Sequence, residues 1–273
     1  RILSWHEMAN DVVGGEPVTL SYCTLCGSAV LYSGRVDHPD GDLTLTFGTS
    51  GLLYRSNKLM VDRDTGTLWS NITGQAVVGR LAEPPSDGGP VPELTPLPVT
   101  ATTWGEWRAR HPDTTVLALD EARGRRWGFD YRPGAADRAR QGVSFPVWQK
   151  SARLDPRTEV YTLRLGGVPK AYPLDRLEEE GVVNDTVGGE ALVLVSDPAS
   201  GAVRAYRRGG LAFRWSDDGS LALIDAEGRP WSLTEEALVP PPDSGLAPLA
   251  RIPGNNAFWF GWFGFYPETE VYE

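Results

Sequence analysis

Apolar residues in this chain come in short runs that end at glycine, proline or Asn-Asp turns, and such runs favour β-strands over helices. The pattern predicts strands over residues 17–22, 29–32, 43–47, 67–70 and 191–196. The turn-rich stretch 37–41 separates two of these strands and predicts a hairpin between 29–32 and 43–47.

Only short helices are expected. Thr103 can cap a helix over 103–110, and Pro112 follows its end. A second short helix is predicted over 173–180. Residues 158–172 precede it and predict a hairpin that turns at Gly166-Gly167.

An internal duplication organises the chain. Residues 10–16 (Asn-Asp-Val-Val-Gly-Gly-Glu) recur as residues 184–190 (Asn-Asp-Thr-Val-Gly-Gly-Glu). Further matches follow in the same order: 51–55 with 210–214, 62–70 with 225–232, and 107–116 with 262–271. Because chance similarity rarely keeps its order, the pattern predicts two copies of one structural unit.

We therefore predict a mainly β protein (β-rich α+β) of two pseudo-symmetric fused repeats with a few short helices. The first repeat covers residues 1–119, a charged linker covers 120–156, and a second, degenerate repeat covers 157–273. The repeats are expected to share their strand order, with Trp69 and Trp231 at equivalent buried positions.

The second repeat begins with a hairpin that the first one lacks. If the repeats are built alike, an equivalent hairpin precedes Arg1 in the full protein.

Composition and charge narrow the classes of partner. A chain of 273 residues can bury a core without disulfides, and its 31 glycines and 22 prolines agree with many tight turns. The formal net charge of −10 repels phosphate backbones, so nucleic acid is not expected as a partner. No apolar run approaches the ~20 residues of a membrane-spanning helix, so no transmembrane span is expected.

Candidate chemistry is confined to the first repeat. Cys23 and Cys26 form a Cys-x-x-Cys motif, and His6 and His111 are further soft ligands. The second repeat carries Asp197, Ser200, Glu180 and Tyr266 at the corresponding positions. Two thiolates and two imidazoles can hold zinc or copper, so these four residues are the predicted metal ligands.

Other interpretations stay open at this point. The two cysteines can instead form a redox-active or structural disulfide, or pack as buried thiols. His6 can be a surface or packing residue, and His111 can complement the dipole of the helix that it ends.

The C-terminal block is unusually aromatic. The helix expected there has no polar face. Burial between the two repeats is one explanation, and docking on a protein partner or a membrane surface is the other. The residues that would dock are Phe258, Trp259, Phe260, Trp262 and Phe263.

Six motifs occur together, at residues 5–7, 10–15, 22–28, 47–54, 60–66 and 68–70. Their joint set resembles a prokaryotic family of unknown function, domain of unknown function 3179, over nearly the whole chain. The family usually has Tyr-Cys-Pro-Leu-Cys-Gly where this chain has Thr24 in place of the proline. Because many members look secreted or lipid-anchored, the resemblance implies an extracytoplasmic location: periplasmic, cell envelope or secreted.

Together these patterns predict an extracytoplasmic protein with a metal-binding or thiol-redox site in its first repeat. The alternative is a non-catalytic structural or accessory subunit of a cell-envelope assembly. In that case the cysteines form a structural disulfide and the aromatic block is the docking surface.

Overall fold

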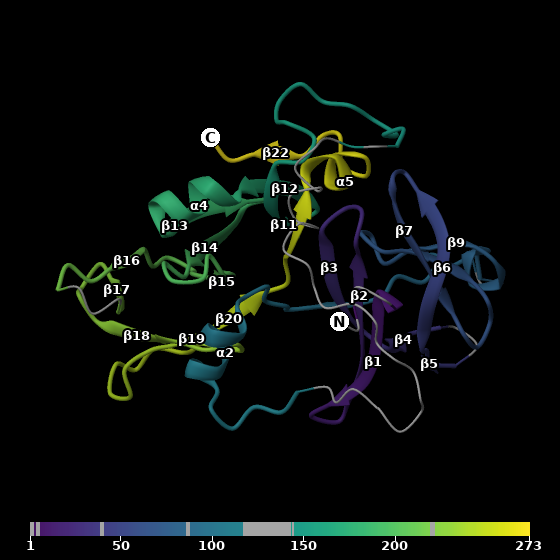
Figure 1. The fold of residues 1–273 in the computed structure, drawn as a ribbon. Helices are drawn as coiled ribbons and strands as arrows, with labels where there is room; N and C mark the ends of the chain where they lie inside the picture. Colours follow the sequence, from purple (N-terminus) through teal and green to yellow (C-terminus); the bar gives the residue numbers. More distant parts are fainter. Residues whose placement is uncertain are drawn as a thin grey trace. The chain divides into compact units, whose positions relative to one another are not determined.

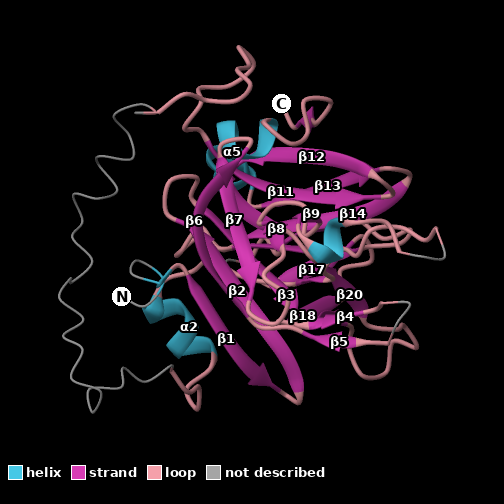
Figure 2. Ribbon diagram, turned by 90° about the vertical axis from the view of Figure 1, so that its right-hand side faces the viewer, coloured by secondary structure: helices cyan, strands magenta, loops and turns pink. Residues whose placement is uncertain are grey.

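The computed structural model describes residues 3, 6–38, 41–85, 88–116, 143, 145–218 and 222–273. Most of the predicted linker 120–156 therefore lies outside the described residues. The prediction of a mainly β protein with a few short helices is confirmed, as the dominance of strands in Figure 2 shows.

The chain forms two compact units, each assembled from three segments. Unit 1 comprises Arg1–Leu97, Thr115–Glu159 and Ala257–Pro267. Unit 2 comprises Pro98–Thr114, Val160–Asn256 and Glu268–Glu273. The cysteines lie in unit 1, and the helix that ends at His111 lies in unit 2.

Unit 1 is built from short antiparallel strands (Figure 1). They are β1 (Met8–Val13), β2 (Glu16–Cys23), β3 (Ser28–Ser33), β4 (Arg35–Val36), β5 (Leu43–Thr44), β6 (Phe47–Tyr54), β7 (Asn57–Asp62), β8 (Leu68–Ser70), β9 (Ala76–Val78) and β10 (Pro96–Leu97). Two four-stranded sheets follow the orders β1-β2-β3-β10 and β6-β7-β8-β9, and β4 pairs with β5. The 3₁₀ helix η1 (Arg80–Ala82) and the helix α5 (Trp259–Phe263) complete the regular elements described in this unit.

Unit 2 contains a larger sheet and a smaller one. The strands are β11 (Glu159–Leu165), β12 (Val168–Pro173), β13 (Val182–Val187), β14 (Glu190–Ser196), β15 (Val203–Arg207), β16 (Phe213–Trp215), β17 (Leu223–Asp225), β18 (Pro230–Leu233), β19 (Ala237–Val239), β20 (Leu249–Ile252), β21 (Asn255–Phe258) and β22 (Glu270–Val271). Eight strands form one sheet in the order β13-β14-β15-β20-β19-β18-β17-β16. The smaller sheet has the order β21-β11-β12-β22, in which β12 and β22 run parallel.

The predicted helices and the hairpin before the second one are confirmed. The helix α2 (Trp104–Arg110) begins after Thr103, whose side chain accepts a hydrogen bond from the Glu106 amide. The helix α4 (Leu174–Glu180) follows the β11–β12 hairpin, which turns at Gly166-Gly167.

An asparagine side chain joins two edge strands in each unit. Asn10 on β1 donates to the Phe47 carbonyl at 2.9 Å and accepts from the Phe47 amide at 2.8 Å. Asn184 on β13 makes the same pair of bonds with Phe213, at 2.7 and 2.8 Å. These bonds satisfy backbone groups that would otherwise face a strand edge without a partner.

The two tryptophans occupy matching environments, as the sequence predicts. Trp69 and Trp231 are buried, and each donates its Nε1 proton at 2.9 Å to a buried aspartate, Asp62 or Asp225. Each also packs edge-on against the phenylalanine held by the asparagine of its unit. The order β6-β7-β8-β9 in unit 1 matches β16-β17-β18-β19 in unit 2. Superposition of the complete repeats stays a prediction.

One sequence match is wrong in its register. Phe213 corresponds to Phe47 and not to Tyr54, because Asn10 and Asn184 bind the backbones of Phe47 and Phe213. The stretch around 51–55 is instead the irregular part of β6, where the pairing with β7 shifts register.

The hairpin expected between residues 29–32 and 43–47 does not form. β3 pairs with β2 and β10, and the short strands β4 and β5 form the hairpin instead. The chain changes direction at Gly34, where an added Cβ would lie 3.0 Å from the Leu45 carbonyl oxygen. Only glycine allows this close approach without a shift of the backbone.

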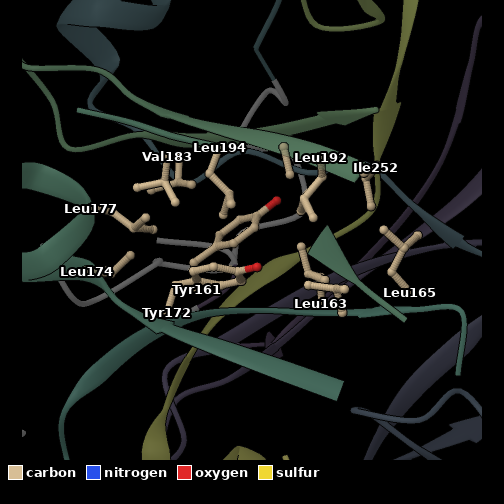
Figure 3. Close-up of a cluster of buried hydrophobic side chains, with 13 residues drawn as sticks. Tyr161, Leu163, Leu165, Tyr172, Leu174, Leu177, Val183, Leu192, Leu194 and Ile252 are labelled. Carbon is tan, nitrogen blue, oxygen red and sulfur yellow. The ribbon is translucent and has the colours of Figure 1, made fainter. Parts of the chain in front are cut away.

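Each unit has its own apolar core. In unit 2 the rings of Tyr161 and Tyr172 lie among Leu192, Leu194 and Leu177 (Figure 3). In unit 1 the core forms around Phe47, Met60 and Trp69. No helix in the described part of the chain is long and apolar enough to cross a membrane.

Replacing Asn10 or Asn184 by alanine is expected to lower the free energy of unfolding by about 1–3 kcal/mol. Either change leaves a phenylalanine amide and carbonyl without their partner. Urea-induced unfolding measures the effect. Val12→Ala, at a side chain that is 64% exposed, is the control and should change stability by less than about 0.5 kcal/mol. Equal stability of Asn10→Ala and this control would contradict the assigned role.

Candidate functional site

The two cysteines stand at opposite ends of the turn that joins β2 to β3. Cys23 is the last residue of β2 and is the register partner of Ser28, the first residue of β3. The Cys26 amide donates to the Cys23 carbonyl at 3.2 Å, and Gly27 closes the turn with φ of 60°. This tight turn brings the Sγ atoms of the cysteines within 2.6 Å of each other.

Both thiols are free and covered by apolar side chains. Cys23 is 2% exposed and Cys26 is fully buried. Phe258 and Phe260 belong to the same buried cluster, and Phe145 packs against it. The Phe258 ring lies on the turn so closely that a Cβ at Gly27 would meet it at 3.0 Å.

The two thiols differ in acidity. The hydrogen bond donated by the Cys26 thiol lowers the pKa of Cys23 and outweighs the effect of burial. Backbone amides, including that of Lys58, add to this lowering of the pKa. Burial and the neighbouring Cys23 charge raise the pKa of Cys26 well above its usual range. Cys23 is therefore the more acidic thiol of the pair, and Cys26 is the less acidic one.

A buried ion pair lies beside the turn. The Lys58 ammonium is 3.2 Å from a Glu7 carboxylate oxygen, and the lysine side chain is only 4% exposed. Burial lowers the pKa of Lys58, while the charges of Glu7 and Cys23 raise it and offset part of that change. The Lys58 cation and the Cys23 thiolate therefore stabilise each other.

Thr24 ties this ion pair to the turn. Its hydroxyl donates to Glu7 Oε1 at 2.6 Å. Burial opposes ionisation of Glu7, but this bond and the Lys58 charge outweigh it and lower the pKa of Glu7. Thr24 thus positions the carboxylate that holds Lys58.

A buried polar cluster lies next to the dithiol. Asn57 and Asn71 both donate to the Ser28 hydroxyl, at 3.3 and 3.1 Å, and all three residues are fully buried. A Cβ added at Gly261 would lie 3.1 Å from Cys26 Cβ and 3.4 Å from Asn57 Nδ2. The polar cluster therefore lies close to Cys26.

Unit 2 contains a turn of the same kind with fixed charge. Asp197 and Ser200 stand where unit 1 has the two cysteines, and Gly201 repeats the positive φ of Gly27 at 67°. The Ser200 hydroxyl donates to Asp197 at 2.9 Å, just as the Cys26 thiol donates to Cys23. Arg110 lies 3.3 Å from the Asp197 carboxylate. The turn can therefore hold an anion at its first position when a donor occupies its fourth.

The four predicted metal ligands are not brought together. Cys23 and Cys26 are adjacent, and His6 is half-buried in the same unit. His111 belongs to unit 2, where its ring stacks on Trp107 with centroids 4.2 Å apart. Within the described ranges, no three Cys, His, Asp or Glu side chains gather closely enough to hold a metal ion.

The aromatic block is buried, and the structure gives no support to docking of a partner through it. The five side chains are at most 9% exposed. They are Phe258, Trp259, Phe260, Trp262 and Phe263. α5 is short and apolar on all sides, which is typical of a helix buried within a core.

A model for a protein family of unknown function, DUF3179, matches residues 1–269. The chain belongs to this family. The resemblance predicted from the motifs is thereby confirmed. No curated protein matches the chain. No solved structure matches it either.

Sequence reasoning found the two sulfurs of this family member but missed the groups that act on them. Glu7, Lys58 and Asn57 are separated from the cysteines along the chain and form no motif with them. One signal was available: Lys58 is one of only three lysines in an arginine-rich chain. A buried lysine can change its protonation state, whereas arginine cannot.

The donor at position 26 is expected to control the reactivity of Cys23. Cys26→Ala removes the donor, raises the pKa of Cys23 and leaves less thiolate at neutral pH. The rate of iodoacetamide alkylation at pH 7 should therefore fall about tenfold relative to Cys26→Ser. Cys26→Ser is the matched control because it keeps a hydroxyl donor, as Ser200 does in unit 2. Equal pH–rate profiles for the two variants would argue against this role.

Proposed function

We propose that this protein is a thiol–disulfide oxidoreductase in which Cys23 is the nucleophile and Cys26 is the resolving thiol. The observation that carries the proposal is the unequal pair: two free thiols 2.6 Å apart, with the pKa of one lowered and that of the other raised. A low-pKa thiolate attacks disulfides at neutral pH, and a protonated neighbour waits to complete the exchange.

The reaction follows from this arrangement. The Cys23 thiolate attacks one sulfur of a substrate disulfide, forms a mixed disulfide and releases the other sulfur as a thiolate. Cys26 then loses its proton, and its sulfur attacks Cys23 Sγ. The protein disulfide forms and the second substrate thiolate leaves. Two electrons pass from the protein dithiol to the substrate. The Cys26 proton goes to one released substrate thiolate, and the other thiolate takes a proton from the solvent.

Lys58 and Glu7 support the charged steps. The Lys58 ammonium stabilises the Cys23 thiolate before attack. When Cys23 becomes part of a mixed disulfide its charge disappears, and this source of support for the lysine cation is lost. Glu7 holds Lys58 beside the turn throughout, through the contact at 3.2 Å.

Thiol chemistry fits the donor set better than a metal centre does. The sulfurs adjoin hydroxyl, amide and ammonium groups, and an ammonium group repels a metal cation. A location outside the cytoplasm, as the family resemblance implies, is part of this proposal because dithiol catalysts there encounter disulfides continually.

The burial of both sulfurs favours the rival function, a structural subunit whose cysteines form a permanent disulfide. The two functions differ in how the pair responds to glutathione. Structural disulfides resist reduction by the glutathione pool, whereas catalytic ones equilibrate with it.

A redox titration tests the proposal. The protein is equilibrated at a series of reduced-to-oxidised glutathione ratios, alkylated and weighed by mass spectrometry. We expect reversible loss and recovery of two thiols, and a glutathione adduct on Cys23 in the Cys26→Ser variant. A disulfide that no glutathione ratio reduces, or the absence of an adduct in Cys26→Ser, would overturn the proposal.

The cover over the sulfurs is expected to limit the rate of the first step. Phe145 packs against the cluster that contains both cysteines. Phe145→Ala should raise the alkylation rate of Cys23 in the Cys26→Ser background by several-fold because it opens a path to the thiolate. Trp148→Ala, at an exposed side chain in the same segment, is the control. Equal alkylation rates for the two variants would show that reagents do not reach Cys23 past Phe145.

A further inference from the structure

A pocket of about 540 Å³ in unit 1 adjoins the dithiol. Its lining residues come from the segment around 143–157 and from α5. Phe145, Val147 and Phe260 line the pocket and also belong to, or pack against, the apolar cluster that holds the cysteines. The pocket and the sulfurs are therefore on two sides of one layer of side chains.

The walls of the pocket are aromatic. Phe145 meets Phe260 edge-on with ring centroids 5.7 Å apart, and Trp259 meets Phe263 at 5.1 Å. All four rings line the pocket. Such walls suit a flat apolar group, because aromatic rings pack well in edge-on and offset arrangements.

The charged side chains in the lining have a net positive charge. Lys150 and Arg157 line the pocket, and Asp155 is the one carboxylate in its described lining. The whole chain carries a net charge of −10, so this local excess of positive charge differs from the molecule around it. A negatively charged ligand is attracted to such a pocket.

We propose that this pocket is the substrate subsite of the dithiol and selects disulfides that carry an aromatic ring and a carboxylate. The inference rests on the proposed function, since it assigns the substrate class of that same site. The ring packs on Trp259 and Phe263, and the carboxylate lies toward Lys150. The disulfide then faces the Phe145–Phe260 layer, and Phe145 must move for the sulfur to reach Cys23.

This chemistry can come from an aromatic low-molecular-weight disulfide or from a cystine in an extended acidic peptide. In either case the exchange is the one written above. One substrate disulfide is reduced to two thiols, and the protein dithiol is oxidised to a disulfide.

Stopped-flow oxidation of the reduced protein tests the subsite with three small disulfides. Dithiobis-nitrobenzoate is aromatic and anionic, dithiodipyridine is aromatic and uncharged, and hydroxyethyl disulfide is aliphatic and uncharged. Each variant's rate is divided by the wild-type rate with the same disulfide, which removes differences in intrinsic reactivity between the reagents.

Gln149→Trp adds bulk at the pocket wall without deleting a core side chain. We expect it to slow both aromatic disulfides about tenfold and to leave hydroxyethyl disulfide unchanged. Lys150→Gln should slow only the anionic reagent, by about threefold, as expected for an exposed charge. Arg80→Gln removes one exposed positive charge from unit 1 outside the pocket lining and is the matched control.

A peptide arm distinguishes the two sources of the ligand. The disulfide dimer of a Glu-Phe-Cys peptide is compared with that of a Lys-Ala-Cys peptide. A normalised rate for Gln149→Trp that falls with the Glu-Phe-Cys dimer and not with the Lys-Ala-Cys dimer assigns the subsite to extended protein segments. A fall with dithiobis-nitrobenzoate and with neither peptide assigns it to small molecules.

The failures of the two proposals are distinguishable. If no disulfide oxidises Cys23, the proposed oxidoreductase function fails. If all three disulfides react and Gln149→Trp and Lys150→Gln leave every normalised rate unchanged, the dithiol function stands and the subsite is overturned.

Discussion

The tight turn between β2 and β3 is the constraint on which the candidate site depends. It fixes Cys23 at a strand end and Cys26 three residues later, so the two sulfurs meet within 2.6 Å. The Cys26 thiol donates to Cys23 at this distance, which lowers the pKa of Cys23, whereas burial and the neighbouring Cys23 charge raise the pKa of Cys26. The unequal acidity thus depends on the hydrogen bond that the turn allows and on the burial of Cys26.

Packing then determines how far apart the pKa values of Cys23 and Cys26 are. Phe258, Phe260 and Phe145 exclude water from the sulfurs, and exclusion of water strengthens every remaining electrostatic interaction. Lys58 and Glu7 place a cation beside the Cys23 side of the turn. The Ser28–Asn57–Asn71 cluster supplies hydrogen bonds next to Cys26. The same cover that strengthens the electrostatics also closes the site, which links reactivity to movement of the segment that carries Phe145.

Comparison of the two units separates the scaffold from the chemistry. Both hold a phenylalanine with an asparagine side chain and bury a tryptophan hydrogen-bonded to an aspartate. Both also use a turn in which the fourth residue donates to the first. Unit 2 fills that turn with a permanent anion and a hydroxyl, whereas unit 1 fills it with groups that can exchange electrons. In both turns the donor at the fourth position favours negative charge at the first.

The sequence by itself determined what depends on near neighbours along the chain. Short apolar runs and glycine turns determined the β-rich class, Thr103 determined the start of α2, and the spacing of Cys23 and Cys26 determined that they would meet. These features follow from local backbone preferences and from side chains within a few residues of each other.

Tertiary structure decided the rest. It brought Glu7 and Lys58, which are 51 residues apart in the sequence, to the same turn. It also placed His111 in the unit that lacks the cysteines. It also buried the aromatic helix α5 beside the two cysteines. An apolar helix is stabilised by any surface that excludes water from it, and the local sequence does not encode where that surface lies.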